Sequence, residues 1–328
     1  VINDYRFVWE KRIFRVGASV GLVPITTTSG TLAEVLTAAD SACYTAKDRG
    51  RNRLNIYSPG DGELARRQGE TLWATRINSA LKQDRLRLSY QIIRPLTPGG
   101  GLHYELLLRI EDEDGRLIPP GVFLPAAERY NLSPTLDRWV VTRALTWLRD
   151  HPNHLEQLEL CFINLSGLTL GDGDFLDFAT GQLATTGVPA ERLCFELTET
   201  AAIGRLADAV GLIQGLRSLG CRFALDDFGS GLSSFCYLKN LPVDYLKIDG
   251  LFIRDILDDP IDLTLVRAIN DIGHLMGKRT VAESVESEAI ASKLRGIGVD
   301  YLQGYAIGRP LPLEQMDTQD RPQDRAAY

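Results

Sequence analysis

The stretch Arg222-Phe-Ala-Leu-Asp-Asp-Phe228 joins a short apolar run to two adjacent carboxylates. An apolar run of this length, bounded by polar residues, is typical of a strand buried on both faces. In an α/β barrel, the parallel strands end at one face, and the active site is built there from residues of several strands. We therefore expect a strand over Arg222–Asp226 that ends at a functional site containing Asp226 and Asp227.

The same pattern recurs on both sides of this stretch. From about residue 86 onward, short apolar runs alternate with amphipathic helical patterns near 121–130, 133–149, 174–186, 202–219, 231–239, 262–276 and 286–297. The expected strands are Leu86–Ile93, Leu102–Ile110, Leu158–Leu165, Arg192–Leu197, Arg222–Asp226, Tyr245–Ile248, Thr280–Ala282 and Tyr301–Gln303. Eight strands with helices between most of them favour a closed, TIM-like (β/α)8 barrel over an open sheet. The turn Pro95–Gly101 is too short for a helix, so we expect the first strand to be antiparallel to the second.

The pattern also divides the chain into segments. Residues 1–57 predict a short α+β remnant with strands at Phe14–Pro24 and Leu54–Tyr57 and a helix at Thr31–Arg49. Two strands and one helix bury little apolar surface alone, so this segment looks incomplete. Residues 58–84 are expected to form a linker and a lead-in helix, residues 85–315 the barrel, and residues 316–328 a polar C-terminal tail.

Composition narrows the class of protein. Apolar residues make up 44% and charged residues 24% of the 328 positions, which is ordinary for a globular chain. The formal net charge of −7 argues against a nucleic-acid polymer as partner, although not against a nucleotide bound with cations. Five cysteines without a C-x-x-C pair indicate buried thiols in a reducing cytosol, and no apolar run reaches 18 residues, so we expect a cytoplasmic segment without a membrane span. Val1 is not an initiator methionine, so the parent protein could still carry upstream sensory domains or a membrane tether.

Polar residues fall at or near the ends of seven successive expected strands. They are Glu105, Asn164, Glu196, Asp226, Asp227, Lys247, Glu283 and Gln303. Carboxylates with one amide are hard oxygen ligands suited to Mg²⁺ or Mn²⁺, and two such ions would remove the repulsion among the carboxylates. A two-metal site stabilises both the attacking and the leaving oxygen of a phosphoester displacement. A solvated turn explains any one of these residues, but it does not explain eight in the same register.

Several longer motifs carry a family resemblance. They are Asp226-Asp-Phe-Gly-Ser-Gly-Leu-Ser-Ser-Phe235, Leu241-Pro-Val-Asp-Tyr-Leu-Lys-Ile-Asp249, Phe123-Leu-Pro-Ala-Ala-Glu128, Asn164-Leu-Ser166, Glu196-Leu-Thr-Glu199 and Gln303-Gly-Tyr305. In this order they resemble the EAL domain, the family of cyclic di-GMP phosphodiesterases, over Leu86–Pro312. The resemblance implies metal-dependent hydrolysis of cyclic di-GMP to linear pGpG, commonly by a homodimer that forms through the barrel.

The resemblance also implies a role for each matched residue. The implied metal ligands are Glu105, Asn164, Glu196, Asp226 and Asp227, with Asp226 shared between two Mg²⁺ or Mn²⁺ ions. Lys247 and Glu283 would position or deprotonate the attacking water, supported by Gln303. The implied substrate-binding residues are Gln91, Arg109 and Asp249. Glu199 would hold the loop that begins at Phe228, Gly229 and Ser230, which would couple the metal site to the dimer interface.

Two positions depart from the family pattern. The Glu-Ala-Leu motif reads Glu105-Leu-Leu107, which keeps the carboxylate and changes only packing. The Ala-Glu-Gly-Val-Glu motif reads Ala282-Glu-Ser-Val-Glu286, so Ser284 stands where the family has glycine. If that position requires a positive φ, a serine there is strained and lowers activity.

The first segment resembles the last third of a GGDEF (diguanylate cyclase) domain through Ala39-Asp-Ser-Ala-Cys-Tyr-Thr-Ala-Lys47 and Gly50-Arg-Asn-Arg53. The loop that names that family is absent, so Lys47 and Arg51 cannot form a cyclase site. Two alternatives to hydrolysis stay open for the barrel. One is a receptor that binds cyclic di-GMP without cleaving it, although such members generally lose metal ligands and none is lost here. The other is an unrelated barrel enzyme of the enolase kind, against which the Asp226-Asp-Phe-Gly229 loop argues.

Overall fold

The computed structural model describes residues 6–9, 12–15, 18–26, 53–57, 61–97, 101–229 and 235–316, with scattered positions between 29 and 46. The chain divides into two compact units, Val1–Asn78 and Ser79–Tyr328. Several expected features lie outside the described residues: Ser230 and the rest of its loop to residue 234, Lys47, Arg51, and the tail beyond residue 316.

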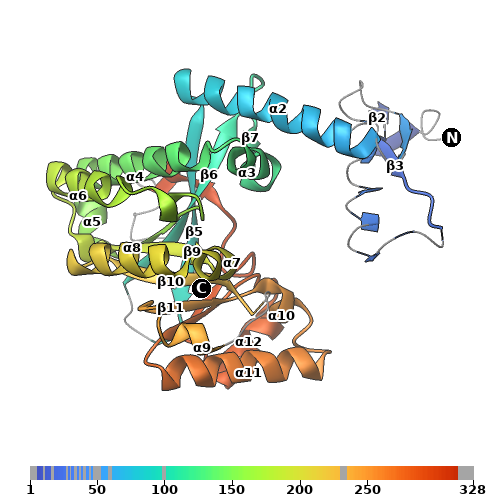
Figure 1. The fold of residues 1–328 in the computed structure, drawn as a ribbon. Helices are drawn as coiled ribbons and strands as arrows, with labels where there is room; N and C mark the ends of the chain where they lie inside the picture. The colour runs from blue at the N-terminus through green and yellow to red at the C-terminus, as the bar shows by residue number, and fades with distance from the viewer. Residues whose placement is uncertain are drawn as a thin grey trace. The chain divides into compact units, whose positions relative to one another are not determined.

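The second unit is a closed barrel of eight strands (Figure 1). The strands are β5 (Leu86–Pro95), β6 (Leu102–Glu111), β8 (Leu158–Asn164), β9 (Leu193–Thr198), β10 (Arg222–Phe228), β11 (Tyr245–Ile248), β12 (Arg279–Ala282) and β13 (Tyr301–Gln303). The strands from β6 and β8 to β13 are parallel to their neighbours, and pairing of β5 with β6 closes the ring. Because β5 pairs antiparallel with both β6 and β13, the prediction of a TIM-like barrel with a reversed first strand is confirmed.

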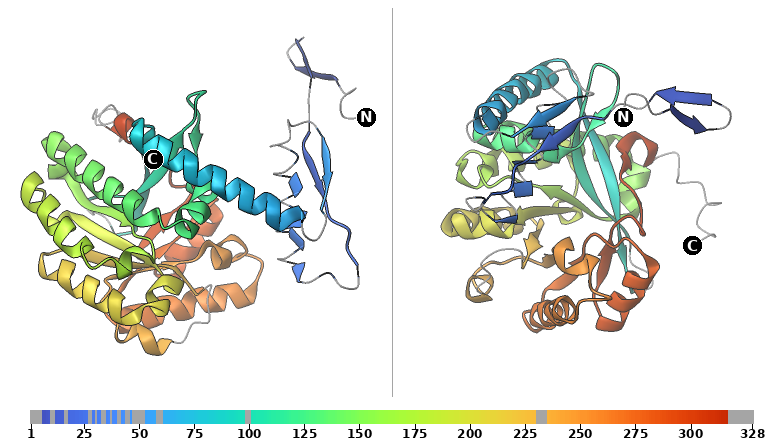
Figure 2. Two further views of the ribbon diagram at one scale, coloured as in Figure 1. Left: turned by 45° about the horizontal axis from the view of Figure 1, so that its top comes forward. Right: turned by 90° about the vertical axis from the view of Figure 1, so that its right-hand side faces the viewer.

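Helices cover the outside of this barrel (Figure 2). They are α3 (Pro120–Arg129), α4 (Ser133–Asp150), α5 (Pro152–Gln157), α6 (Phe175–Thr186), α7 (Glu199–Gly204), α8 (Leu206–Ser218), α9 (Phe235–Leu238), α10 (Gly250–Arg254), α11 (Pro260–Leu275) and α12 (Glu288–Ile297). The sequence predicted one helix over 202–219, but the backbone breaks at Arg205 (φ −138°) and separates α7 from α8. Gly204, a poor helix former, precedes this break. The short helices α5 and α10 were not predicted, because five or six residues give too little periodicity.

The barrel interior is filled by a separate apolar layer. Its residues are Ile93, Leu160, Phe162, Cys194, Ala224, Tyr245, Val281 and Tyr301. The ring centroids of Phe162 and Tyr245 lie 5.4 Å apart at 72°, the edge-to-face geometry that aromatic pairs prefer. Cys161, Cys194 and Cys221 are buried thiols without a disulfide, as the apolar runs around them predict. The interior is therefore a packed core that closes the barrel below the polar residues.

Two short strands complete the barrel unit, and a smaller unit precedes it. In the barrel unit, β7 (Leu117–Ile118) pairs with β6 and β14 (Leu311–Pro312) with β5. In the first unit, β1 (Arg6–Trp9) pairs with β2 (Arg12–Arg15), and β3 (Val20–Leu22) pairs in parallel with β4 (Leu54–Ile56). The strand expected at Phe14–Pro24 is thus two strands. Helix α2 (Asp61–Lys82) leads to the start of β5, and no described helix is long and apolar enough to cross a membrane.

Candidate metal and phosphodiester site

A buried lysine lies at the centre of the polar residues. Lys247, on β11, is 1% exposed, and its Nζ lies 3.0 Å from Glu196 Oε2 and 3.2 Å from Glu105 Oε2. Asp226 Oδ1 lies 3.0 Å and Glu283 Oε1 2.7 Å from the same nitrogen. Burial alone would lower the pKa of Lys247, but the four carboxylates raise it well above its ordinary value. Lys247 is therefore a fixed positive charge that gathers carboxylates from four other strands or strand ends.

Two amides hold the carboxylate of Glu105. Asn164 Nδ2 donates to Glu105 Oε1 at 2.6 Å, and Gln303 Nε2 donates to Glu105 Oε2 at 2.7 Å. Gln303 Nε2 also lies 3.3 Å from Gln91 Oε1, and Gln91 donates in turn to the Gly308 carbonyl at 2.9 Å. Because Asn164 donates through its nitrogen, its amide oxygen remains the atom that could bind a cation. The side chain of Glu105 is thus oriented from both sides.

The carboxylates of Asp226 and Asp227 lie close together because strand β10 is irregular at these two residues. Neighbouring residues of an extended strand point to opposite faces, so two adjacent carboxylates would ordinarily be separated. Here the pairing of β10 with β11 shifts register between Leu225 and Phe228, and Asp227 adopts a left-handed φ of +53°. As a result, carboxylate oxygens of Asp226, Asp227 and Glu283 lie within 4.8 Å of one another. The backbone irregularity is therefore what assembles this acidic cluster.

The charges of the site do not balance by themselves. Five carboxylates (Glu105, Glu196, Asp226, Asp227 and Glu283) surround one ammonium group, an excess of four negative charges when all are ionised. Burial and then the neighbouring Glu105 raise the pKa of Glu196, whereas burial and then Asp226 raise that of Glu283. Burial and Asp226 likewise raise the pKa of Asp227 to about 6. Among the residues that the structure describes, Glu196 Oε1 is buried without a hydrogen-bond partner, an arrangement that suits an oxygen ligand of a cation.

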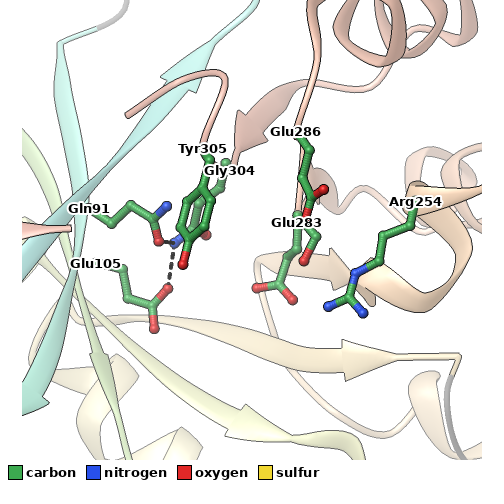
Figure 3. A pocket seen from close by; sticks show the side chains of 9 residues that line it. Gln91, Glu105, Arg254, Glu283, Glu286, Gly304 and Tyr305 are labelled. Atoms are coloured by element: carbon green, nitrogen blue, oxygen red, sulfur yellow. Dashed lines mark hydrogen bonds between the residues drawn. The ribbon is translucent and has the colours of Figure 1, made fainter. Parts of the chain in front are cut away.

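A pocket of about 270 Å³ opens beside Glu283 (Figure 3). Gln91 and Glu105 lie on one side of it, and Glu283, Glu286 and Arg254 lie on the other. Ser284, Gln303, Gly304 and Tyr305 complete its lining. Sequence reasoning missed Arg254 and Glu286. Arg254 lies on a helix too short to be predicted, and Glu286 stands in a quoted motif without any sign that it faces a pocket.

A second pocket, of about 300 Å³, is also lined by Glu105, together with Asn164. Its walls are largely apolar, and Asp137 of α4 supplies a carboxylate. Burial raises the pKa of Asp137 to about 6, although its carboxylate accepts hydrogen bonds from Ser166 N at 2.8 Å and from Thr169 Oγ1 at 2.5 Å. Sequence reasoning missed Asp137 because one carboxylate on an amphipathic helix resembles an ordinary surface charge.

The remaining predicted residues lie close to this centre. Arg109 is partly buried, and burial lowers its pKa while Glu105 and Tyr305 oppose that shift, so both lie near the guanidinium group. Asp249 caps α10 by accepting a hydrogen bond from Leu251 N at 2.8 Å, and its charge contributes to the raised pKa of Asp227. Asp249 therefore has a structural role that the sequence did not indicate.

The loop after β10 is attached to a buried carboxylate. Glu199 Oε2 accepts a hydrogen bond from Gly229 N at 2.8 Å, and the other oxygen accepts one from the Tyr237 hydroxyl. Phe228, beside Gly229, is fully buried. A side chain at Gly229 (φ +100°) would meet Phe252 at 2.8 Å and Ile269 at 3.2 Å, so helices α10 and α11 pack closely against this loop. The loop is thus connected to both the acidic cluster and these helices.

Comparison with known proteins gives one consistent family. The EAL domain family model matches residues 74–310. The chain is 41% identical over 310 residues to the cyclic di-GMP phosphodiesterase PdeB of Shewanella oneidensis, covering 93% of this chain and 36% of PdeB. It is 34% identical over 304 residues to the bifunctional diguanylate cyclase/cyclic di-GMP phosphodiesterase MucR of Pseudomonas aeruginosa, covering 92% of this chain and 44% of MucR. The chain therefore spans less than half the length of these relatives.

A solved structure gives the same result. The PaMucR phosphodiesterase in complex with c-di-GMP superposes with a TM-score of 0.70 at 33% identity, covering 74% of this chain and 99% of that one. The barrel described above is therefore the architecture of that phosphodiesterase.

Proposed function

Because this chain belongs to the EAL domain family, we propose that its barrel hydrolyses cyclic di-GMP to linear 5′-pGpG with divalent cations. The observation that carries the proposal is the convergence of four carboxylates on Lys247, with Asp227 beside two of them, Asp226 and Glu283. No position of the expected ligand set is lost, which favours hydrolysis over a receptor that only binds.

The donor set fits hard divalent cations. Glu105, Asn164, Glu196 and Asp226 would hold one ion, and Asp226 with Asp227 a second. The excess of four negative charges supports two Mg²⁺ or Mn²⁺ ions, because two divalent cations would neutralise it. When bound, such ions polarise the phosphodiester and lower the pKa of a water molecule. Asn164 and Gln303 orient the carboxylate of Glu105, a proposed ligand, through hydrogen bonds to its two oxygens.

The protein groups divide the chemistry among themselves. Lys247, held positive by its carboxylates, would hydrogen-bond the attacking water or offset charge on the pentavalent phosphorus. Glu283 lies at the edge of the pocket with a raised pKa, so its carboxylate would accept the proton of that water. Gln303 would help to position Lys247 through Glu105, whose Oε2 accepts hydrogen bonds from both.

The two pockets would receive the two halves of the substrate. Cyclic di-GMP contains two nucleotides, and Glu105 lines both pockets. Gln91 lies in the first pocket, and Arg109, whose pKa is influenced by Glu105, would contact a phosphate. Asp137 in the second pocket would accept hydrogen bonds from a guanine, which presents N–H donors on its Watson–Crick edge. Asp249 would contribute to substrate binding through its place beside Asp227.

We also propose that the barrel forms a homodimer through α10 and α11. These helices and the turn between them carry exposed apolar side chains at Leu251 (60%), Leu257, Ile261 (67%) and Leu265. Phe252 and Ile269, on the same helices, pack near Gly229, so pairing of two barrels there would reach Asp226 and Asp227 through Glu199, Phe228 and Gly229. We propose that Ser230, the next residue of this loop, takes part in the same coupling between the dimer interface and the metal site.

The segment before the barrel is proposed to be the end of a GGDEF-like domain. The MucR match of 304 residues is longer than the 237 residues spanned by 74–310, so it extends beyond the EAL segment into a region of a bifunctional cyclase. In a parent protein, upstream sensory domains would control the barrel through this segment.

The deciding experiment is a chromatographic assay of cyclic di-GMP and pGpG with Mg²⁺, Mn²⁺ and Ca²⁺ in parallel, on a dimeric preparation. We expect pGpG with Mg²⁺ or Mn²⁺ and none after chelation of the metal. Tight binding with the ligand recovered intact under all three cations would instead identify a receptor.

A further inference from the structure

Ser284 is held in a conformation that serine rarely adopts. It follows Glu283 at the end of β12, and its φ of +51° lies in the left-handed region. A side chain at such a φ collides with its own backbone carbonyl, so glycine is the residue that ordinarily occupies it. Ser284 lines the pocket beside Glu283, and in the described part of the chain its hydroxyl has no hydrogen-bond partner.

Gly250 leaves the space that the side chain of Ser284 fills. A Cβ atom at Gly250 would lie 2.2 Å from Ser284 Oγ and 2.6 Å from Ser284 Cβ, well inside contact distance. Gly250 is buried at the start of α10, where Asp249 caps the helix, so its backbone cannot move away easily. Side chains at positions 250 and 284 therefore exclude each other.

The turn is also fixed on its other side. A Cβ atom at Gly304 (φ +155°) would lie 2.2 Å from Val285 N, so the two backbones are in direct contact. Val285 N donates to the Gln303 carbonyl at 3.0 Å, which ties the turn to β13. The turn that contains Ser284 is thus held between Gly250 and Gly304, which restricts a shift of its backbone.

We propose that Ser284 is a specificity-determining residue that contacts the nucleoside part of the substrate, and that Gly250 is the partner that makes this side chain possible. The inference rests on the proposed function, because it concerns the nucleotide that enters the pocket beside Glu283. That pocket also presents the amides of Gln91 and Gln303 and the guanidinium of Arg254, so a hydroxyl adds a donor and acceptor to a polar wall. The side chain of Ser284 fits only because residue 250 is a glycine and has no side chain of its own.

The first test separates the hydroxyl from the strain. Ser284→Ala removes the hydroxyl and keeps the left-handed backbone, and we expect KM for cyclic di-GMP to rise about 2- to 10-fold, the loss of one hydrogen bond, with kcat within about twofold. For bis(4-nitrophenyl) phosphate, a phosphodiester without a nucleoside, we expect the same KM in both proteins. An unchanged KM for cyclic di-GMP in an active wild-type background overturns the proposal, and so does an equal rise for both substrates.

The second test measures the steric coupling between Ser284 and Gly250 through thermal stability. Ser284→Gly relieves the strained φ and should raise Tm by roughly 2 °C. Gly250→Ala should lower Tm markedly, and most of that loss should disappear in the Gly250→Ala/Ser284→Gly double variant. Asp84→Gly is the matched control, because Asp84 also has a left-handed φ (+50°) and lies outside both pockets, so it should raise Tm without changing KM. Additive effects of the two substitutions overturn the pairing.

The proposed function and this inference can fail separately. If the wild-type protein hydrolyses neither substrate with any cation, the proposed function fails. The Ser284→Ala comparison is then made on the Kd for cyclic di-GMP by calorimetry in Ca²⁺, where an unchanged Kd overturns the contact. The Tm measurements on the single and double variants need no enzymatic activity. They therefore test the steric coupling of Gly250 and Ser284 in either case.

Discussion

Two layers of side chains fill the same barrel, and they are two residues apart on the same strands. The lower layer contains Phe162, Cys194, Ala224, Tyr245, Val281 and Tyr301, and the upper layer contains Asn164, Glu196, Asp226, Lys247, Glu283 and Gln303. Residues i and i+2 of a strand point to the same face, so one set of strands builds both layers. The lower layer excludes water and stabilises the fold. The upper layer concentrates like charges, which costs stability in the absence of bound cations. Substitutions in the two layers should therefore affect stability and activity differently.

The largest effect is expected in the upper layer. Glu105→Gln keeps the shape of a side chain that bonds Asn164, Gln303 and Lys247 but removes its charge. We expect hydrolysis of cyclic di-GMP to fall by about 10³-fold or more, because Glu105 is a proposed metal ligand. Removing one of five like charges should not lower Tm of the metal-free protein. Asp227→Ala should behave alike. A Glu105→Gln variant that keeps its activity, or that unfolds, would contradict the assignment of activity to the upper layer and stability to the lower layer.

A substitution in the lower layer should show the opposite behaviour. Phe162→Ala removes a fully buried ring that packs edge-to-face on Tyr245. We expect a loss of about 3–5 kcal/mol in the free energy of unfolding, measured by urea denaturation. At a temperature where the variant is still folded, metal affinity should change far less than in Glu105→Gln. A loss below about 1 kcal/mol would show that the interior is not tightly packed.

The pH dependence of stability should reveal the cost of the upper layer. The pKa values of Glu196 and Glu283 are raised in the folded protein, and that of Asp227 is raised to about 6. A raised pKa means that folding favours the protonated group, so this stability is present below the unfolded pKa near 4 and is lost as pH rises through the folded pKa. Metal-free protein should therefore lose Tm between about pH 5 and pH 8. Lys247 stays charged in this window because its pKa is raised too. Saturating Mn²⁺ should remove the loss, and a Tm that rises with pH without metal would contradict the charge excess.

The smallest effect concerns the loop above the upper layer. Tyr237→Phe removes the hydroxyl that donates to Glu199, which in turn accepts from Gly229 N. We expect the metal concentration for half-maximal activity to rise about 3- to 10-fold, with kcat at saturating metal little changed, because one positioning hydrogen bond is lost. Tyr57→Phe, a tyrosine in the first unit, is the control. An unchanged metal requirement would show that Glu199 holds the loop without Tyr237.

The layers also show what the sequence could predict. Apolar runs placed each barrel strand within one to two residues at most ends, because an apolar run buried on both faces has few alternatives. The polar residues around Lys247 could be predicted because they lie at or near the ends of those strands. Backbone angles did not follow, so neither the turn at Asp227 nor the conformation of Ser284 was visible, although the departure from glycine at position 284 indicated where to look. The pockets depend on packing between distant helices and strands, which is why Asp137 and Arg254 were missed.

The reversed first strand has a consequence for how this barrel can be joined to other domains. In a barrel whose strands are all parallel, the chain enters at the face opposite the active site. Here β5 runs against β6, and the pairing of Leu86 with Ile110 puts the first residue of β5 beside the carboxyl-terminal end of β6. The chain therefore enters the barrel at the face where the parallel strands end, so a segment ahead of β5 is covalently attached at that face.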